Sequence, residues 1–269
     1  MDIAKCIHWR GLKLRASLHF PAAYNTHPKG IFPLIIICHG FTSSRIGVDR
    51  LFVKSAVQLE REGNIVVRFD YAGCGESEGQ YGENSFDDLI EQTQTVITFG
   101  TELPGVDRNQ VTLIGHSLGG AVAAITAAKD HRVKNLVLWS AVGRPYDDIS
   151  AIVGPAECDE IEKSRCIDHL GYTLTPKFLE SLKRFNPIEK IARFNGHALI
   201  IHGTGDKVIT SEYAKHYVYS LKEKAEKTLI QGACHTFSTG PHFDQLINRT
   251  KKWMRYRTSS EERMAKKTS

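Results

Sequence analysis

Short runs of apolar residues recur along this chain and alternate with longer stretches in which apolar residues lie three or four positions apart. The continuous apolar runs predict strands over residues 34–38, 65–69, 111–114, 136–139, 198–202 and 227–230. The helical spacing predicts helices over residues 50–62, 86–101 and 243–256, and a further one directly after residue 117. Strands without a polar face, separated by helices, are typical of a mostly parallel sheet covered by helices on both faces. The pattern therefore predicts an α/β protein.

Two segments depart from this alternation. Residues 3–8 and 12–20 alternate across a short connection, which predicts an antiparallel hairpin at an edge of the sheet. Residues 142–195 contain no run that would add a strand to the sheet, and this span is too long for a simple connection. Amphipathic pieces over residues 157–170 and 176–185 predict that the span is a helical insertion, which we expect to cover the site as a lid.

The chain of 269 residues is long enough for one substantial core. We expect an α/β core of residues 1–141 and 196–257, the helical lid of residues 142–195, and a basic tail of residues 258–269 that is solvated and flexible.

Apolar and polar side chains have different predicted roles in the lid. Its apolar residues at helical spacing are expected to pack the lid onto the core, and they are Phe178, Leu179, Leu182 and Phe185. His169 and Tyr172 are the polar candidates for substrate recognition.

The segment Gly115-His116-Ser117-Leu118-Gly119 carries the strongest chemical signal. It follows a β-branched run and precedes an alanine-rich stretch, so it fits a strand–turn–helix elbow that exposes one serine hydroxyl. Flanking glycines let the chain turn tightly around a strained residue. A serine in an ordinary glycine-rich turn would share the pentapeptide but not this context. The sequence therefore predicts Ser117 as a nucleophile.

A serine needs a base to activate it and an acid to orient that base. His235 lies in a loop after the last predicted strand, and Asp206 lies just beyond the strand over residues 198–202. The chain order Ser117, Asp206, His235 is the order of an α/β-hydrolase triad. Asp147 and Asp148 follow an earlier strand and compete for the role of the acid.

An oxyanion would require backbone donors near the serine. The strand over residues 34–38 ends in His39-Gly40-Phe41, where the glycine lets amides turn inward. We expect the N–H groups of Phe41 and Leu118 to form the oxyanion hole.

Together these motifs resemble the α/β-hydrolase superfamily, and within it the small bacterial serine esterases that include the cinnamoyl (feruloyl) esterases. The resemblance spans nearly the whole chain. It is based on residues 39–41, residues 69–79, the elbow at Ser117, residues 202–206 and residues 232–237. It implies an α/β-hydrolase fold and cleavage of a carboxylic ester whose acyl group is of moderate size or aromatic. Fold and triad are shared with thioesterases and peptidases, so a carrier-bound or peptide substrate stays open. A non-catalytic hydrolase fold that binds a small ligand is the third hypothesis, and the presence of all three triad residue types argues against it.

Composition and charge limit the possible partners and the location of the protein. Eight of the 35 Lys and Arg residues, but only two of the 30 acidic residues, fall in residues 249–269, so the rest of the chain is near neutral. A nucleic-acid partner is not expected, because it would need cations clustered on the folded surface. The start of the chain lacks a signal-peptide pattern and no run is long enough to span a membrane, which predicts a cytoplasmic protein.

Cofactor chemistry is not expected from the sequence. The six cysteines show no paired or zinc-like spacing, and the histidines have no ligand-like grouping, so we expect no metal. Gly73 and Gly75 suggest a dinucleotide loop, but Gly79 has the wrong spacing and no helix opens on these glycines. The expected partner is a small ester substrate, and a homodimer stays open.

Overall fold

A central sheet of eight strands organises the computed structural model, which describes residues 2–27, 30–163 and 165–268. The strand order is β1-β2-β4-β3-β5-β6-β9-β10. These strands are β1 (Asp2–Trp9), β2 (Leu12–His19), β3 (Phe32–Cys38), β4 (Ile65–Phe69), β5 (Val106–His116), β6 (Val133–Trp139), β9 (His197–Gly203) and β10 (Ala225–Ile230). Among the described strand pairs of this sheet, β1–β2 and β2–β4 are antiparallel and the other five are parallel. The predicted mostly parallel sheet with an antiparallel edge is confirmed.

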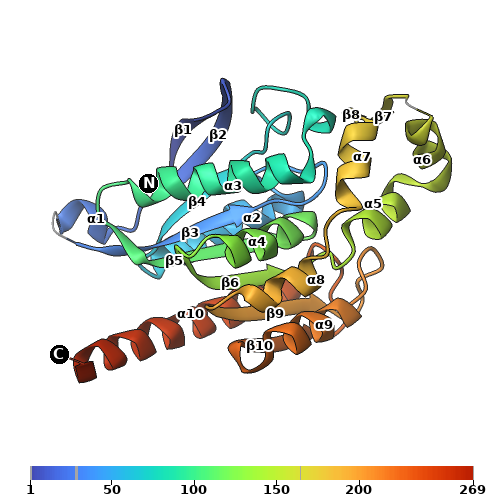
Figure 1. The fold of residues 1–269 in the computed structure, drawn as a ribbon. Coiled ribbons are helices and arrows are strands. Elements are labelled where there is room, and N and C mark those ends of the chain that lie inside the picture. The colour runs from blue at the N-terminus through green and yellow to red at the C-terminus, as the bar shows by residue number, and fades with distance from the viewer. Residues whose placement is uncertain (1, 28–29, 164, 269) are drawn as a thin grey trace.

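Helices cover both faces of this sheet (Figure 1). The longer ones are α2 (Leu51–Arg61), α3 (Phe86–Thr101), α4 (Leu118–Lys129), α9 (Glu212–Leu221) and α10 (Gly240–Thr268). Side chains of α3, α4 and α9 pack into one core cluster, and those of α2 and α10 pack into the other. The strand β3 shows why its apolar run is continuous: Leu34 and Ile36 enter the first cluster, whereas Ile35 and Ile37 enter the second.

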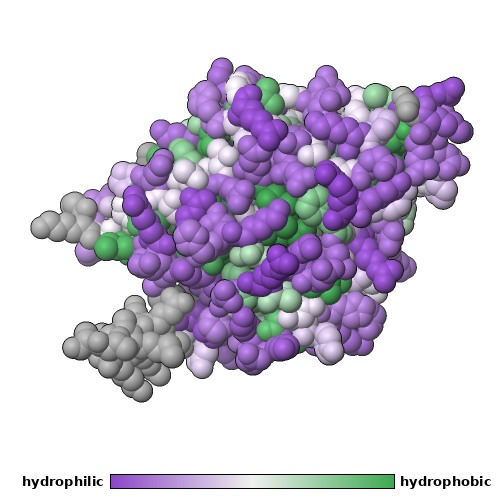
Figure 2. All heavy atoms as spheres, in the orientation of Figure 1, coloured by the Kyte–Doolittle hydropathy of each residue, from purple (hydrophilic) through white to green (hydrophobic). Residues whose placement is uncertain are grey.

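The view coloured by hydropathy agrees with this layering. Hydrophilic side chains dominate the face shown, and hydrophobic atoms are visible mainly in small areas between them (Figure 2). The apolar sides of the helices are therefore turned inward toward the sheet.

The edge hairpin follows directly from its sequence. Arg10 and Gly11 join β1 to β2, and both have positive φ, of 44° and 83°. A two-residue turn with two positive φ angles matches the twist of a β-hairpin, and glycine makes the second position cheap to adopt.

The span between β6 and β9 is mainly helical, but it differs from the prediction in one part. It holds α5 (Pro145–Val153), α6 (Pro155–Glu162), α7 (Pro176–Leu182) and α8 (Pro187–Lys190). The predicted helical piece over residues 157–170 is wrong beyond Glu162, because β7 (Ile167–His169) and β8 (Tyr172–Leu174) form a separate antiparallel pair. Leu170 and Gly171 have φ of 55° and 82°, and Asp168 Oδ1 accepts a hydrogen bond from Gly171 N at 3.2 Å. This tight turn replaces the helix.

The helices near the C-terminus also differ from the sequence prediction. The helix α9 was not predicted, although Tyr213, Ala214, Tyr217 and Leu221 are buried at helical spacing. The last helix, predicted over residues 243–256, extends from Gly240 to Thr268. The side chains of residues 258–269 lie outside the described part, so a flexible basic tail stays a prediction.

Short elements complete the chain. They are α1 (Ala23–Thr26) and the 3₁₀ turns η1 (Val48–Arg50), η2 (Tyr81–Glu83), η3 (Ile191–Arg193) and η4 (Lys222–Lys224). Within the described residues, no helix combines the length and the apolar composition that a membrane span requires.

Candidate active site

Ser117 lies in a sharp turn between β5 and α4. Its φ and ψ are 56° and −126°, a conformation that costs a non-glycine residue roughly 1–3 kcal/mol. Backbone hydrogen bonds hold it there: its N–H donates to Trp139 O at 3.1 Å, and its carbonyl accepts from Gly120 N at 2.9 Å and Val142 N at 3.1 Å. The surrounding structure therefore stabilises a strained serine at the carboxyl end of the sheet.

The glycines of the elbow allow close backbone approach. A Cβ on Gly119 would collide with the carbonyl oxygens of Cys38 and His39, and a Cβ on Gly115 would collide with the carbonyl of Gly119. Since backbone atoms cannot move aside like a flexible side chain, these positions require glycine. The absence of two Cβ atoms brings the start of α4 against the end of β3.

The segment after β3 passes directly over the serine. A Cβ on Gly40 would lie 3.0 Å from Ser117 Cβ and 3.4 Å from Ser117 Oγ. His39 holds this segment, because its Nδ1 donates to Gly40 O at 2.9 Å and its Nε2 accepts from Tyr71 N at 3.1 Å. Burial lowers the pKa of His39, which keeps the ring neutral in these two roles. The backbone of Phe41 follows next, and Leu118 is the first residue of α4.

The structure brings His235 and Asp206 together. His235 Nδ1 donates to Asp206 Oδ2 at 2.8 Å, although the residues come from loops after different strands. Asp206 Oδ1 accepts from the backbone N–H groups of Val208 and Ile209, each at 2.9 Å. With Nδ1 as the donor, the neutral ring leaves Nε2 unprotonated and able to accept a proton.

A second histidine also contacts the Asp206 carboxylate. His202 Nε2 lies 3.2 Å from Asp206 Oδ2 and 3.0 Å from Ile209 O, so this nitrogen must carry a proton. Burial alone would raise the pKa of Asp206, but hydrogen bonds from His202 and His235 outweigh it and lower this pKa well below the usual range. The carboxylate therefore stays ionised.

His116, directly before the serine, fixes the backbone of His235. Its Nε2 lies 2.9 Å from His235 O, and the two rings are 4.8 Å apart between centroids. Burial, followed by the proximity of His235, lowers the pKa of His116 to about 3. Neither the role of His116 nor that of His202 is predicted from the sequence, although each lies within four residues of a predicted triad member.

The competing acids are placed differently. Asp148 Oδ2 accepts from Gly143 N and Arg144 N at the start of α5, and its Oδ1 accepts from Tyr213 Oη at 3.0 Å. Asp147 is exposed and forms an ion pair with Arg144. Both carboxylates thus serve the insertion, whereas Asp206 contacts His235.

His169 and Tyr172 face each other across the β7–β8 pair and take part in a group of aromatic rings. The Phe41 ring lies 5.6 Å from His169 and is stacked on Phe178 at 5.8 Å, while Tyr81 lies 5.7 Å from Tyr172, all between ring centroids. Phe178 is fully buried, in keeping with its predicted packing role. The insertion therefore rests on the residue that follows Gly40.

A buried carboxylate that the sequence analysis also missed anchors the same region. Asp70 is completely buried after β4 and accepts hydrogen bonds from Arg45, both backbone and side chain, and from Glu76 N at 3.1 Å. It ties the segment after Phe41 to the loop with Gly73 and Gly75, which accordingly has a structural role.

Comparisons with known proteins agree with this architecture. A family model described as "Serine aminopeptidase, S33" matches residues 28–158, just under half of the chain. The thiohydrolase aneE of Aspergillus aculeatus is 31% identical over 129 residues, which cover 47% of this chain and 37% of that protein. An uncharacterized 31.7 kDa protein of Escherichia coli is 35% identical over 105 residues, which cover 39% and 36%. The matched parts thus span about a third of the length of these curated relatives.

Solved structures match over nearly the whole chain. Est1E from Butyrivibrio proteoclasticus, in a structure with bound ferulic acid, has a TM-score of 0.84 at 22% identity and covers 95% of this chain and 100% of its own. The α/β hydrolase GrgF from Penicillium has a TM-score of 0.77 at 16% identity, covering 95% and 98%. These matches show that the chain has the α/β-hydrolase fold. The family model is named for an aminopeptidase and the Aspergillus aculeatus relative for a thiohydrolase, so these names imply different bonds.

Proposed function

We propose that this protein is a serine hydrolase that cleaves carboxylic esters through an acyl-enzyme on Ser117. The observation that carries the proposal is a strained serine at a strand–helix elbow combined with a histidine whose Nδ1 donates to a buried carboxylate at 2.8 Å. In the proposed reaction, His235 Nε2 takes the hydroxyl proton as Ser117 Oγ attacks the ester carbonyl. Asp206 orients the ring and stabilises its charged form.

The backbone N–H groups of Phe41 and Leu118 are the proposed donors to the oxyanion. The close approach of Gly40 to Ser117 supports this assignment, as does the position of Leu118 at the start of α4, where a helix has free N–H groups. His235 then protonates the leaving alcohol. Water next attacks the acyl-enzyme carbonyl while His235 takes its proton, and His235 returns that proton to Ser117 Oγ as the Ser117–acyl bond breaks and the acid leaves.

An apolar or aromatic acyl group is the favoured substrate. The half-buried ring of Phe41 belongs to the proposed oxyanion loop, and the half-buried His169 and Tyr172 are candidate polar contacts close to it. The fold also matches a structure with bound ferulic acid. A thioesterase is the second candidate, since one relative is named a thiohydrolase.

Kinetics on matched substrates test the proposal. We would compare kcat/KM for nitrophenyl esters of increasing chain length, hydroxycinnamate esters, acyl thioesters and peptide amides, with Ser117→Ala as the control. The proposal predicts a preference for esters that the Ser117→Ala variant abolishes. A preference for thioesters or amides of more than about tenfold, a difference of about 1.4 kcal/mol in transition-state stabilisation, would contradict the ester assignment.

A further inference from the structure

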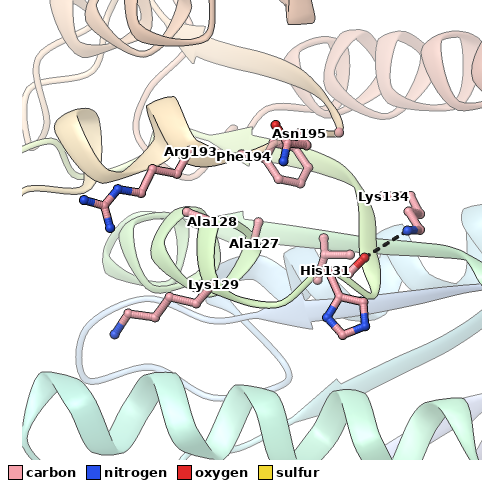
Figure 3. A pocket seen from close by; sticks show the side chains of 10 residues that line it. Ala127, Ala128, Lys129, His131, Lys134, Arg193, Phe194 and Asn195 are labelled. Carbon is pink, nitrogen blue, oxygen red and sulfur yellow. Dashed lines mark hydrogen bonds between the residues drawn. The ribbon is translucent and has the colours of Figure 1, made fainter.

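A cavity of about 350 Å³ lies at the end of the sheet opposite the reactive serine (Figure 3). It lies where α4 ends and where β6 and β9 begin, whereas Ser117 precedes the first residue of α4. The lining residues are Ala127, Ala128, Lys129, His131, Val133, Lys134, Arg193, Phe194, Asn195 and Gly196. A volume of this size is sufficient for a small organic ligand.

The lining of the cavity carries positive charges that no carboxylate in the lining neutralises. Lys129, Lys134 and Arg193 contribute positive charge from three separate segments, His131 can add to it, and no lining residue carries a carboxylate. Within the described residues none of the three cations forms an ion pair with a carboxylate. The neighbouring Arg132, which does not line the cavity, pairs with Asp130 at 2.6 Å.

The surroundings of the cavity are positive as well. Lys224 Nζ lies beside the rim, where it donates to Phe194 O at 3.0 Å. His197 directly follows the lining residue Gly196, and its pKa is lowered by burial and then by the positive charges of Arg257 and Lys224. This second observation indicates a positive electrostatic potential at this end of the sheet.

Local structural roles account for only part of the cluster. Lys129 is in the last turn of α4, where a cation stabilises the helix dipole, and Lys134 Nζ donates to His131 O at 2.9 Å. Arg193 is exposed at the end of η3 and has no such partner among the residues that the structure describes. An ammonium group has three N–H donors, so Lys134 can also serve a ligand.

The apolar part of the lining restricts the ligand further. Figure 3 shows the methyl groups of Ala127 and Ala128 between the Lys129–Arg193 side and the His131–Lys134 side of the cavity. The buried Val133 and Phe194 complete this apolar surface. A ligand that satisfies the whole lining needs a strongly anionic head and a small apolar body.

We propose that this cavity binds a small organic phosphate monoester, with its dianionic head at Lys129 and Arg193 and its apolar group on the alanine surface. A phosphate monoester carries up to two negative charges and three acceptor oxygens, which suit several cations better than a single carboxylate does. The proposal is independent of the reaction at Ser117.

Isothermal titration calorimetry with phenyl phosphate tests the site. We expect one phenyl phosphate per chain with a Kd of about 1 mM or tighter at low ionic strength, weakening as salt is added. Benzoate has the ring with one charge, and inorganic phosphate has the charge without the ring, so both should bind at least about threefold more weakly.

The variant Arg193→Glu tests whether phenyl phosphate binds in this cavity. Because Arg193 is exposed, its replacement should leave the thermal transition unchanged while raising the Kd for phenyl phosphate by about tenfold or more. Arg61→Glu is the matched control, since Arg61 is an exposed cation in the last turn of α2, and it should change the Kd by less than about twofold. Activity on a nitrophenyl ester should be the same in both variants. Absence of saturable binding, or an equal effect of both variants, would overturn the proposal.

Discussion

His116 must stay uncharged in the folded protein, and this requirement makes stability depend on pH. The ring is 6% exposed, its Nε2 contacts His235 O, and its pKa falls from 6.5 to about 3. As the pH decreases below 6.5, the unfolded chain takes up a proton that the folded chain does not. The free energy of unfolding therefore decreases by up to about 1.4 kcal/mol per pH unit until about pH 3. This contribution is fully present above pH 6.5, and about 2 kcal/mol of it is lost by pH 5.

The variant His116→Gln isolates this contribution. Glutamine does not titrate and retains an N–H donor that can reach the His235 carbonyl. Urea unfolding, followed by circular dichroism at pH 7.5 and pH 5, should show that the variant loses about 2 kcal/mol less than the wild type over this interval. The exposed His131→Gln should behave like the wild type. Equal losses in the wild type and His116→Gln would refute the idea of a buried neutral ring.

Three further changes test the site itself. Asp206→Asn should lower kcat on the order of ten-thousand-fold with folding intact, because a neutral amide cannot stabilise the charged His235 ring; turnover within about tenfold of the wild type would exclude Asp206 as the orienting acid. Gly119→Ala should lower kcat/KM by about a hundredfold or more, since the new Cβ pushes the elbow away from the segment that follows β3, whereas Gly240→Ala, with open space at its Cβ, should change it little. His202→Leu removes a hydrogen-bond donor to Asp206, so the carboxylate stabilises the protonated His235 ring more strongly and the acidic limb of the kcat/KM–pH profile should move to higher pH. His202→Gln should restore the wild-type profile, and profiles that coincide for the wild type and both variants would show that His202 does not act through Asp206.

The central sheet could be predicted because strands that are buried on both faces consist of continuous runs of apolar residues. Continuous apolar runs identified β3, β4 and the buried half of β5 correctly. The first half of β5 is polar and is not predicted, because residues 108–110 fall within the irregularity in its pairing with β3, between the pairs Pro33–Asp107 and Leu34–Val111. Edge and irregular pairing depends on neighbours that are distant in the sequence.

The insertion was less predictable because turn geometry overrides helical spacing there. Its apolar residues in α7 are buried as predicted, yet the helical piece predicted over residues 157–170 extends wrongly through β7 to Leu170 in the β7–β8 turn. A leucine at positive φ gives no signal of its own, since asparagine or glycine would be expected at that position.

The candidate reacting groups can be predicted by type and order, whereas the residues that contact them cannot. Ser117, Asp206 and His235 each occupy a loop at the end of a predicted strand, which a sequence motif can reveal. The contacts of His116, His202 and Asp70 depend on side chains that the fold brings together from distant parts of the sequence.

The central claim is that Ser117 is an activated nucleophile. Labelling with a fluorophosphonate, followed by mass spectrometry of the intact protein and of its peptides, tests this claim most directly. The account predicts one adduct per chain, located on Ser117, which is absent from Ser117→Ala and forms far more slowly in a variant without the His235 imidazole. A wild-type protein that is folded but unlabelled, or an adduct on a different residue, would contradict it.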